Sequence, residues 1–166
     1  MKMMRRYFFN VQPYVLGIQT GIQAGHAAEE TWANAVERYL ASESEQDRDR
    51  LEHLLKFARE HKTWVILNGG DHNALVDLYE FFCHIDNPYE FAKFHEPGLN
   101  NALTSISILL PEKMYDLKAQ EIGKALLAGD TLDETGALLY APTDADKFTV
   151  WELEFLKRKA ACGLAH

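Results

Sequence analysis

The chain has 166 residues, of which 47% are hydrophobic and 25% are charged. This composition is typical of a globular domain and excludes a collagen-like, coiled-coil or disordered chain as the main state. The 17 lysines and arginines stand against 25 aspartates and glutamates, which gives a formal net charge of −8. A broad basic surface for nucleic acid is therefore excluded, whereas a local basic patch is not.

The sequence indicates a protein of the cytoplasm. Its two cysteines, Cys83 and Cys162, are too few for a disulfide framework. The most apolar stretch, Ile106 to Leu110, is much shorter than the roughly 20 residues that a membrane-spanning helix needs. The apolar part of the N-terminus, Tyr7 to Phe9, is too short for a signal peptide. We therefore expect a cytoplasmic protein with no membrane partner.

A strand and a long helix are predicted at the start of the chain. Residues 6–11 (RYFFNV) are aromatic and short, which favours a strand. Thr20 and Gln23 match a capping box, in which each side chain satisfies a free backbone amide of the other, so a helix is predicted over residues 20–41. Its apolar face is predicted from the spacing i, i+4, i+7, i+8: Trp32, Val36, Tyr39 and Leu40.

The middle of the chain alternates between helix and strand. Residues 43–50 are dense in charge and are predicted to be exposed, before a second amphipathic helix over residues 51–62. Residues 63–67 (TWVIL) are an unbroken β-rich run, as in a buried strand. Asp71 follows a glycine turn and is interpreted as the cap of a third helix rather than as a metal ligand. One face of this helix is apolar: Leu75, Leu78, Tyr79 and Phe82.

Two further strands are predicted over residues 89–95 and 103–110, because apolar and polar residues alternate in both. Only about seven residues separate them, so they form either an antiparallel hairpin or non-adjacent strands joined by a crossover. Pro111 is placed in the first turn of a helix that ends near Leu127, where its missing amide hydrogen costs nothing. Strands that alternate with helices predict an α/β fold with a mostly parallel sheet covered on both faces.

Residues 130–166 are predicted to be a C-terminal extension with one helix. Thr149 and Glu152 match a second capping box. The helix that they open carries an apolar stripe: Phe148, Trp151, Phe155 and Leu156. Burying each such side chain contributes roughly 1.5–3 kcal/mol. We therefore expect the helix to dock on the preceding domain or on a second copy of the chain, which would make a homodimer.

Two polar clusters follow the first and the third predicted strand. The first cluster is Gln19, Thr20, Gln23 and His26. The second is His95, Glu96, Asn100, Asn101 and Thr104. Ligands of open α/β sheets gather beyond the carboxyl ends of the strands. If the two strands are parallel, the clusters share one edge of the sheet.

Two segments resemble a known family. Residues 17–27 (GIQTGIQAGHA) resemble the first-helix motif of the type II peptidyl-tRNA hydrolases, and residues 94–111 (FHEPGLNNALTSISILLP) resemble the end of that family's third strand and its fourth strand. The resemblance covers roughly residues 5–127 and is closest to a bacterial and phage subgroup. It implies a three-layer α/β/α sandwich with a four-stranded mixed sheet over residues 1–129. It also implies a cytoplasmic esterase that cleaves the bond between a nascent peptide and tRNA.

The resemblance further implies a set of site residues. The family's histidine, its aspartate and its strand threonine correspond here to His26, Glu96 and Thr104. Its lysine corresponds to Gln19, so a cation that could hold a phosphate or polarise the ester carbonyl is missing. The implied catalytic residues are His26, Glu96, Gln19 and Thr104. The implied substrate-binding residues are Thr20, Gln23, Gly98, Asn100 and Asn101.

The residue types leave alternatives open. Gln23 is equally a helix cap, and His26 is equally a packed, hydrogen-bonded histidine. Asn100 and Asn101 are also typical turn residues, and Thr104 at the start of a strand is often structural. The sequence has no HExxH, CxxC or Walker-type motif, so neither a metal nor another cofactor is expected. The expected partner is peptidyl-tRNA. The alternative is a binding protein that has lost catalysis and holds a nucleotide-like or other small anionic ligand.

Overall fold

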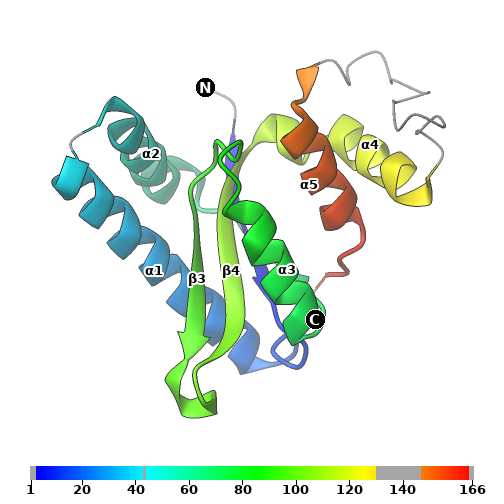
Figure 1. The fold of residues 1–166 in the computed structure, drawn as a ribbon, viewed down its shortest axis with the longest axis horizontal. Helices are drawn as coiled ribbons and strands as arrows, with labels where there is room; N and C mark the ends of the chain where they lie inside the picture. Colours follow the sequence, from blue (N-terminus) through cyan, green and yellow to red (C-terminus); the bar gives the residue numbers. More distant parts are fainter. Residues whose placement is uncertain (1–2, 43, 130–146, 165–166) are drawn as a thin grey trace. The chain divides into compact units, whose positions relative to one another are not determined.

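A computed structural model describes residues 3–42, 44–129 and 147–164 (Figure 1). These residues form two compact units, one running up to Leu110 and including Leu164, the other spanning Pro111–Gly163. The first unit contains the sheet and the helices α1 to α3, and the second contains α4 and α5. Residues 130–146, where the predicted extension begins, lie outside the described residues.

The sheet has four strands in the order β2-β1-β4-β3. Their bounds are Met4–Asn10 for β1, Trp64–Asn68 for β2, Phe91–Glu96 for β3 and Ala102–Pro111 for β4. β1 and β2 pair in parallel, whereas β3 and β4 pair antiparallel, so the sheet is mixed. The predicted α/β fold with a four-stranded mixed sheet is confirmed. The open question about the last two strands is settled in favour of the antiparallel hairpin.

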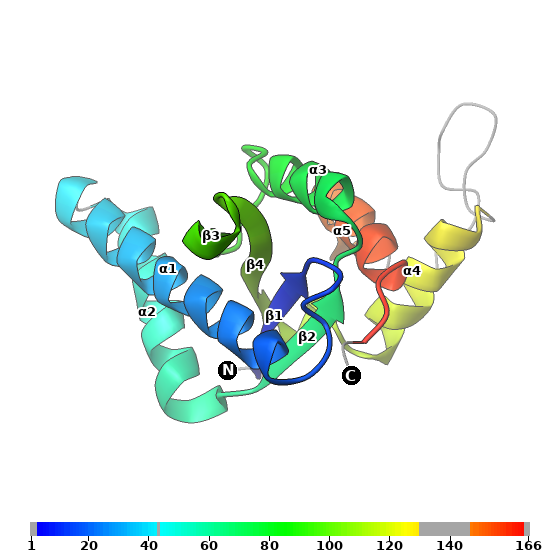
Figure 2. The same ribbon diagram turned by 90° about the horizontal axis from the view of Figure 1, so that it is seen from below.

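Helices cover both faces of this sheet, as Figure 2 shows. α1 (Ile18–Ser42) and α2 (Glu45–Lys56) lie on one face, and α3 (His72–Phe82) lies on the other. Neighbouring residues of β1 serve the two layers, because side chains alternate along a strand. Phe8 packs against alanines of α1, while Phe9 meets the ring of Phe82 in α3 with a centroid distance of 5.9 Å.

The face of α1 that meets the sheet consists mainly of small residues, so the predicted apolar face is wrong. Val36 is 38% exposed and Leu40 is 70% exposed. Trp32 is only partly buried, against a cluster around Leu54. The buried residues of α1 are Gln23, Ala24, Ala27, Ala28, Thr31 and Ala35. The short side chains of the four alanines and Thr31 let the helix axis approach the sheet closely, so most of the large apolar side chains in this layer come from the strands.

Two predicted helix boundaries are wrong for local reasons. Residues 45–50 of the charged segment before the second predicted helix are themselves helical, because Ser44 caps α2 by accepting a hydrogen bond from the Asp47 amide over 3.1 Å. Pro111 is the last residue of β4 rather than the start of a helix. The helix that follows, α4 (Leu117–Ala128), is capped by Asp116 instead. The third helix begins as predicted, with the Asp71 carboxylate accepting from the Ala74 amide.

The second unit consists mainly of α4 and α5 (Val150–Ala160), which pack against each other. The capping box of Thr149 and Glu152 is confirmed. Three residues of the predicted stripe are buried: Trp151, Phe155 and Leu156. A Cβ at Gly123 of α4 would lie 2.5 Å from the Leu156 carbonyl oxygen. Among the described helices, none combines the length and the apolar character that spanning a bilayer requires.

Candidate functional site

Gln23 connects the two polar clusters. It lies on the sheet face of α1 and is only 2% exposed. Its Nε2 donates to Glu96 Oε2 over 3.0 Å, and its Oε1 accepts from Thr104 Oγ1 over 2.6 Å. Both ends of the amide are therefore occupied. Gln23 is not the helix cap that its spacing from Thr20 predicted, because α1 begins at Ile18, before both residues.

A β-bulge brings Thr104 to Gln23. Phe94 pairs with Ser105 and the next residue, His95, pairs with Leu103, so Thr104 is the extra residue of β4. A bulge of this kind redirects a side chain at the end of a sheet. The neighbouring Ser105 donates to the buried Asn10, whose amide donates in turn to the carbonyl of Thr20. The start of β4 therefore holds the start of α1 through two polar links, Thr104 to Gln23 and Ser105 through Asn10 to Thr20.

Glu96 is an oriented carboxylate at the end of β3. Its Oε1 accepts from the Gly98 amide over 3.1 Å, while Oε2 accepts from Gln23. The hydrogen bond from Gln23 is the main cause that lowers the pKa of Glu96, the Gly98 bond is the second, and the electrostatic effect of His26 lowers it further. Hydrogen bonds to the charged form favour that form. Glu96 is therefore ionised at neutral pH and is half-buried with its oxygens in fixed directions.

His26 is exposed and is close enough to this carboxylate for its charge to lower the Glu96 pKa. Its ring stacks on the ring of Phe94, with a centroid distance of 4.5 Å and an interplanar angle of 26°. Phe94 is itself packed against the buried cluster that contains Phe8 and three alanines of α1. His26 is thus not a core histidine: the inner face of its ring rests on an aromatic side chain, and the residue is open to solvent.

The turn after Glu96 explains two of the predicted binding residues by backbone conformation. Asn100 and Asn101 have φ values of 55° and 61°, in the left-handed region that asparagine tolerates better than most residues. The Asn101 amide donates to the Glu96 carbonyl over 3.1 Å, and its carbonyl lies 2.9 Å from His95 Nδ1. Both asparagines are exposed, so they can contact a ligand in addition to forming the turn.

Gln19 and Thr20 differ in their access to solvent. Gln19 is exposed in the first turn of α1, and the described residues offer its side chain no hydrogen-bond partner. It lies at i, i+4 and i+7 with Gln23 and His26, which places all three on one side of the helix. The Thr20 hydroxyl is buried and has no partner among the described residues. Thr20 therefore meets a ligand only through a local movement.

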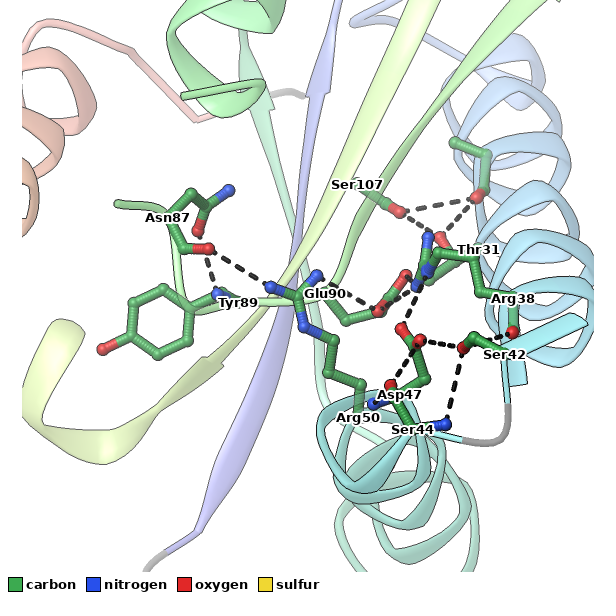
Figure 3. Close-up of polar contacts among 11 residues, drawn as sticks. Thr31, Arg38, Ser42, Ser44, Asp47, Arg50, Asn87, Tyr89, Glu90 and Ser107 are labelled. Atoms are coloured by element: carbon green, nitrogen blue, oxygen red, sulfur yellow. Dashed lines mark hydrogen bonds and ion pairs between the residues drawn. The ribbon is translucent and has the colours of Figure 1, made fainter. Parts of the chain in front are cut away.

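A second polar network, which the sequence did not reveal, lies farther along α1 (Figure 3). Glu90, only 3% exposed, accepts at both oxygens from Arg38 Nη2 over 2.5 Å, and its Oε2 lies 3.9 Å from Arg50. Asp47 accepts from the hydroxyls of two serines beside it. These contacts connect α1, α2 and the segment before β3. Ser44, Asp47 and Arg50 of this network belong to a segment whose charge pattern predicted only exposure.

Arg6 is the least satisfied of the buried charged residues described. It lies in β1 and is 2% exposed, and its Nε and Nη2 have no hydrogen-bond partner among the described residues. Its guanidinium lies 5.1 Å from the centre of the Phe57 ring. Burial lowers the pKa of Arg6 to about 10, while the charges of Glu29 and Glu90 oppose this change. The charge is therefore kept at neutral pH at an energetic cost.

The described residues contain no group of three or more histidine, cysteine, aspartate or glutamate side chains placed to hold a metal ion. The polar residues that do come together are Gln23, His26, Glu96 and Thr104, with Gln19 on the same side of α1. Neither a protein-family model nor a curated protein matches the chain. Any assignment of function therefore rests on this site and on the two segments that form it.

Proposed function

We propose that the protein is a peptidyl-tRNA hydrolase-like esterase, which cleaves the ester between a peptide and the 3′-terminal ribose of tRNA. The observation that carries the proposal is the ionised, hydrogen-bonded Glu96 next to the exposed His26. Residues 17–27 and 94–111, which resemble the type II hydrolases, contribute these two residues and their supports. Such an enzyme works where translation takes place, so a cytoplasmic location is part of the proposal.

Ester hydrolysis requires a base for the attacking water, a donor for the oxyanion and a proton for the leaving oxygen. In the proposed reaction, Glu96 takes a proton from water while the water oxygen attacks the ester carbonyl. Gln19 donates its side-chain amide to the oxyanion. His26 gives a proton to the ribose 3′-oxygen as the carbon–oxygen bond breaks. A carboxylate with a lowered pKa is a weak base, so we expect a slow enzyme.

The other predicted site residues divide into positioning and binding groups. Thr104 is 1% exposed and bonds to Gln23, so in this proposal it positions Glu96 through Gln23 and does not touch the substrate. The Gly98 amide also positions Glu96 and does not bind the substrate, because it already donates to the Glu96 carboxylate. Asn100 and Asn101 are exposed beside it and are the proposed contacts to the tRNA end.

Gln19 favours a second candidate function, a binding protein without catalysis. The resemblance implies a lysine at this position, and an amide can donate a hydrogen bond to an oxyanion but carries no positive charge to hold a phosphate. Such a protein would keep the polar side of α1 and bind a nucleotide-like or other small anionic ligand. Gln19→Lys restores this cation and is used below to test the two candidates. Gln19 is exposed, so the change leaves the buried contacts in place.

The test is incubation of a defined peptidyl-tRNA with the wild type, Glu96→Gln and Gln19→Lys, beside a mock reaction and an established hydrolase. We expect turnover by the wild type that excess EDTA does not change, and a loss of at least about 100-fold in Glu96→Gln. Gln19→Lys should raise kcat/KM and make the salt dependence of tRNA binding steeper by about one phosphate contact. Turnover that survives in Glu96→Gln would contradict the mechanism. Binding without turnover would favour the second candidate.

A further inference from the structure

We infer that the outer face of the His26 ring is a stacking platform for a nucleobase, the 3′-terminal base of the bound tRNA. The inference rests on the proposed function and adds the part of the substrate that this residue recognises. The inner face of the ring lies on Phe94 at 4.5 Å, nearly parallel to it. Because His26 is exposed, the outer face is turned to solvent. Every base has a π face, so an exposed ring of this kind accepts one by stacking.

The platform is held rigidly. Phe94 lies in β3 and packs against a buried cluster of four residues, Phe8, Ala24, Ala27 and Ala28. His26 is carried by α1, whose position is fixed by the Gln23 contacts to Glu96 and Thr104. A ring that is already in place loses little conformational freedom when a ligand binds, which improves affinity without new contacts.

The surface next to the ring is apolar on one side. Ile22, one turn before His26, is 40% exposed, and Ile18, a further turn back, is 80% exposed. On a helix, residues four apart are neighbours, so the two isoleucines continue the platform in a row toward the start of α1. A base stacked on His26 would cover part of this row. The proposal therefore explains why these two isoleucines are exposed: they would contact the bound nucleotide.

The charges around the ring orient the nucleotide. Glu29 and Glu30 are exposed one turn after His26, and they repel phosphate from that end of the platform. The first turn of α1 has no acidic residue, and its free amide groups favour negative charge. The sugar and phosphate should therefore point toward Gln19, which also brings the 3′-ester toward Glu96. Recognition then depends on stacking more than on charge, and its salt dependence should be shallow.

The test uses the trinucleotide CCA and the same molecule with an abasic 3′ residue, with binding measured by calorimetry and by ring-proton shifts. Stacking is worth roughly 1–3 kcal/mol per base, so His26→Ala should weaken CCA binding about 5- to 150-fold. His26→Phe should bind CCA within about threefold of the wild type. The abasic trinucleotide should bind all three proteins equally. His84→Ala, which removes another exposed histidine, is the matched control and should bind CCA as the wild type does.

The outcomes separate the platform from the hydrolase proposal. Turnover of peptidyl-tRNA by the wild type, together with a CCA affinity that is unchanged in a folded His26→Ala variant, would overturn the platform and leave the hydrolase intact. Base-dependent CCA binding without turnover would support the platform and reject the hydrolase. His26→Phe separates the two uses of the residue, because it should keep KM and lower kcat. Equal affinity of the wild type for CCA and for the abasic trinucleotide would also overturn the inference.

Discussion

The hydroxyl of Thr104 donates to the side-chain oxygen of Gln23 over 2.6 Å, and the two residues lie 81 positions apart in the chain. Both are buried, at 1% and 2% exposed. The contact joins β4 to α1 directly beside Glu96. The candidate site thus depends on a pair of side chains that reach no solvent themselves.

Thr104→Val tests this contact, because valine keeps the shape of threonine and removes the hydroxyl. The side-chain oxygen of Gln23 would then be buried without a donor, which costs about 1–3 kcal/mol of unfolding free energy. Urea denaturation measures the loss. Thr104→Ser, which keeps the hydroxyl, should retain most of the hydrogen-bond contribution. Equal stability of the valine variant and the wild type would show that the contact does not form in solution.

Gln23→Leu should raise the pKa of Glu96 toward its ordinary value, because the Gln23 amide is the main cause of its lowering. The lowered pKa stabilises the folded protein above the unfolded pKa, and that stabilisation disappears as the pH falls through the folded pKa. The variant should therefore lose less stability than the wild type on acidification below the usual glutamate range. NMR titration of the Glu96 side-chain carbon measures the pKa directly.

Glu96→Gln is the control for this titration, because it removes the ionising group. The unfolding free energy of Glu96→Gln should lack the part of the pH dependence that ionisation of Glu96 contributes in the wild type. If the Glu96 pKa in Gln23→Leu equals the wild-type pKa, the carboxylate is held by Gly98 alone and the assignment of the main cause is wrong.

Arg6→Met should leave the unfolding free energy unchanged or raise it by up to about 4 kcal/mol. Methionine fills a similar volume, and an apolar side chain in place of a buried charge is often neutral or stabilising. The neighbouring Glu90 keeps Arg38 and Arg50 as partners, so it is not left unpaired. Thermal and urea unfolding at neutral pH measure the change. A loss above about 2 kcal/mol would show that the guanidinium has a partner in solution.

Local patterns in the sequence predicted the elements better than their contacts. The strands and the cap at Asp71 follow from short-range preferences, and those predictions are confirmed. The capping box of Thr20 and Gln23 is equally local, yet it fails: α1 begins earlier, at Ile18, and partners 73 and 81 residues away occupy the Gln23 amide. Nothing near position 23 indicates this competition.

The apolar face of α1 shows a second limit. Large side chains dominate any hydrophobic pattern, so Val36 and Leu40 predicted the buried side, whereas the sheet is met by alanines and Thr31. A row of alanines is visible in the sequence and was the signal that could have located this face. By contrast, the pairing of Glu90 with Arg38 has no short-range signature, because the two residues lie 52 positions apart.

Gly123→Ala tests the packing of the second unit. A Cβ at this position would lie 2.5 Å from the Leu156 carbonyl oxygen and 3.1 Å from its carbon, both backbone atoms of α5, so α4 and α5 must separate to admit it. Overpacking of this kind costs about 1–3 kcal/mol, which exceeds the roughly 1 kcal/mol that alanine gains over glycine in a helix. We expect a net loss of stability. Gly25→Ala in α1 is the matched control, because its Cβ would meet nothing within 4 Å and the change should stabilise the protein. Urea denaturation of both variants gives the comparison, and a stabilised Gly123→Ala would mean that the two helices lie farther apart than described.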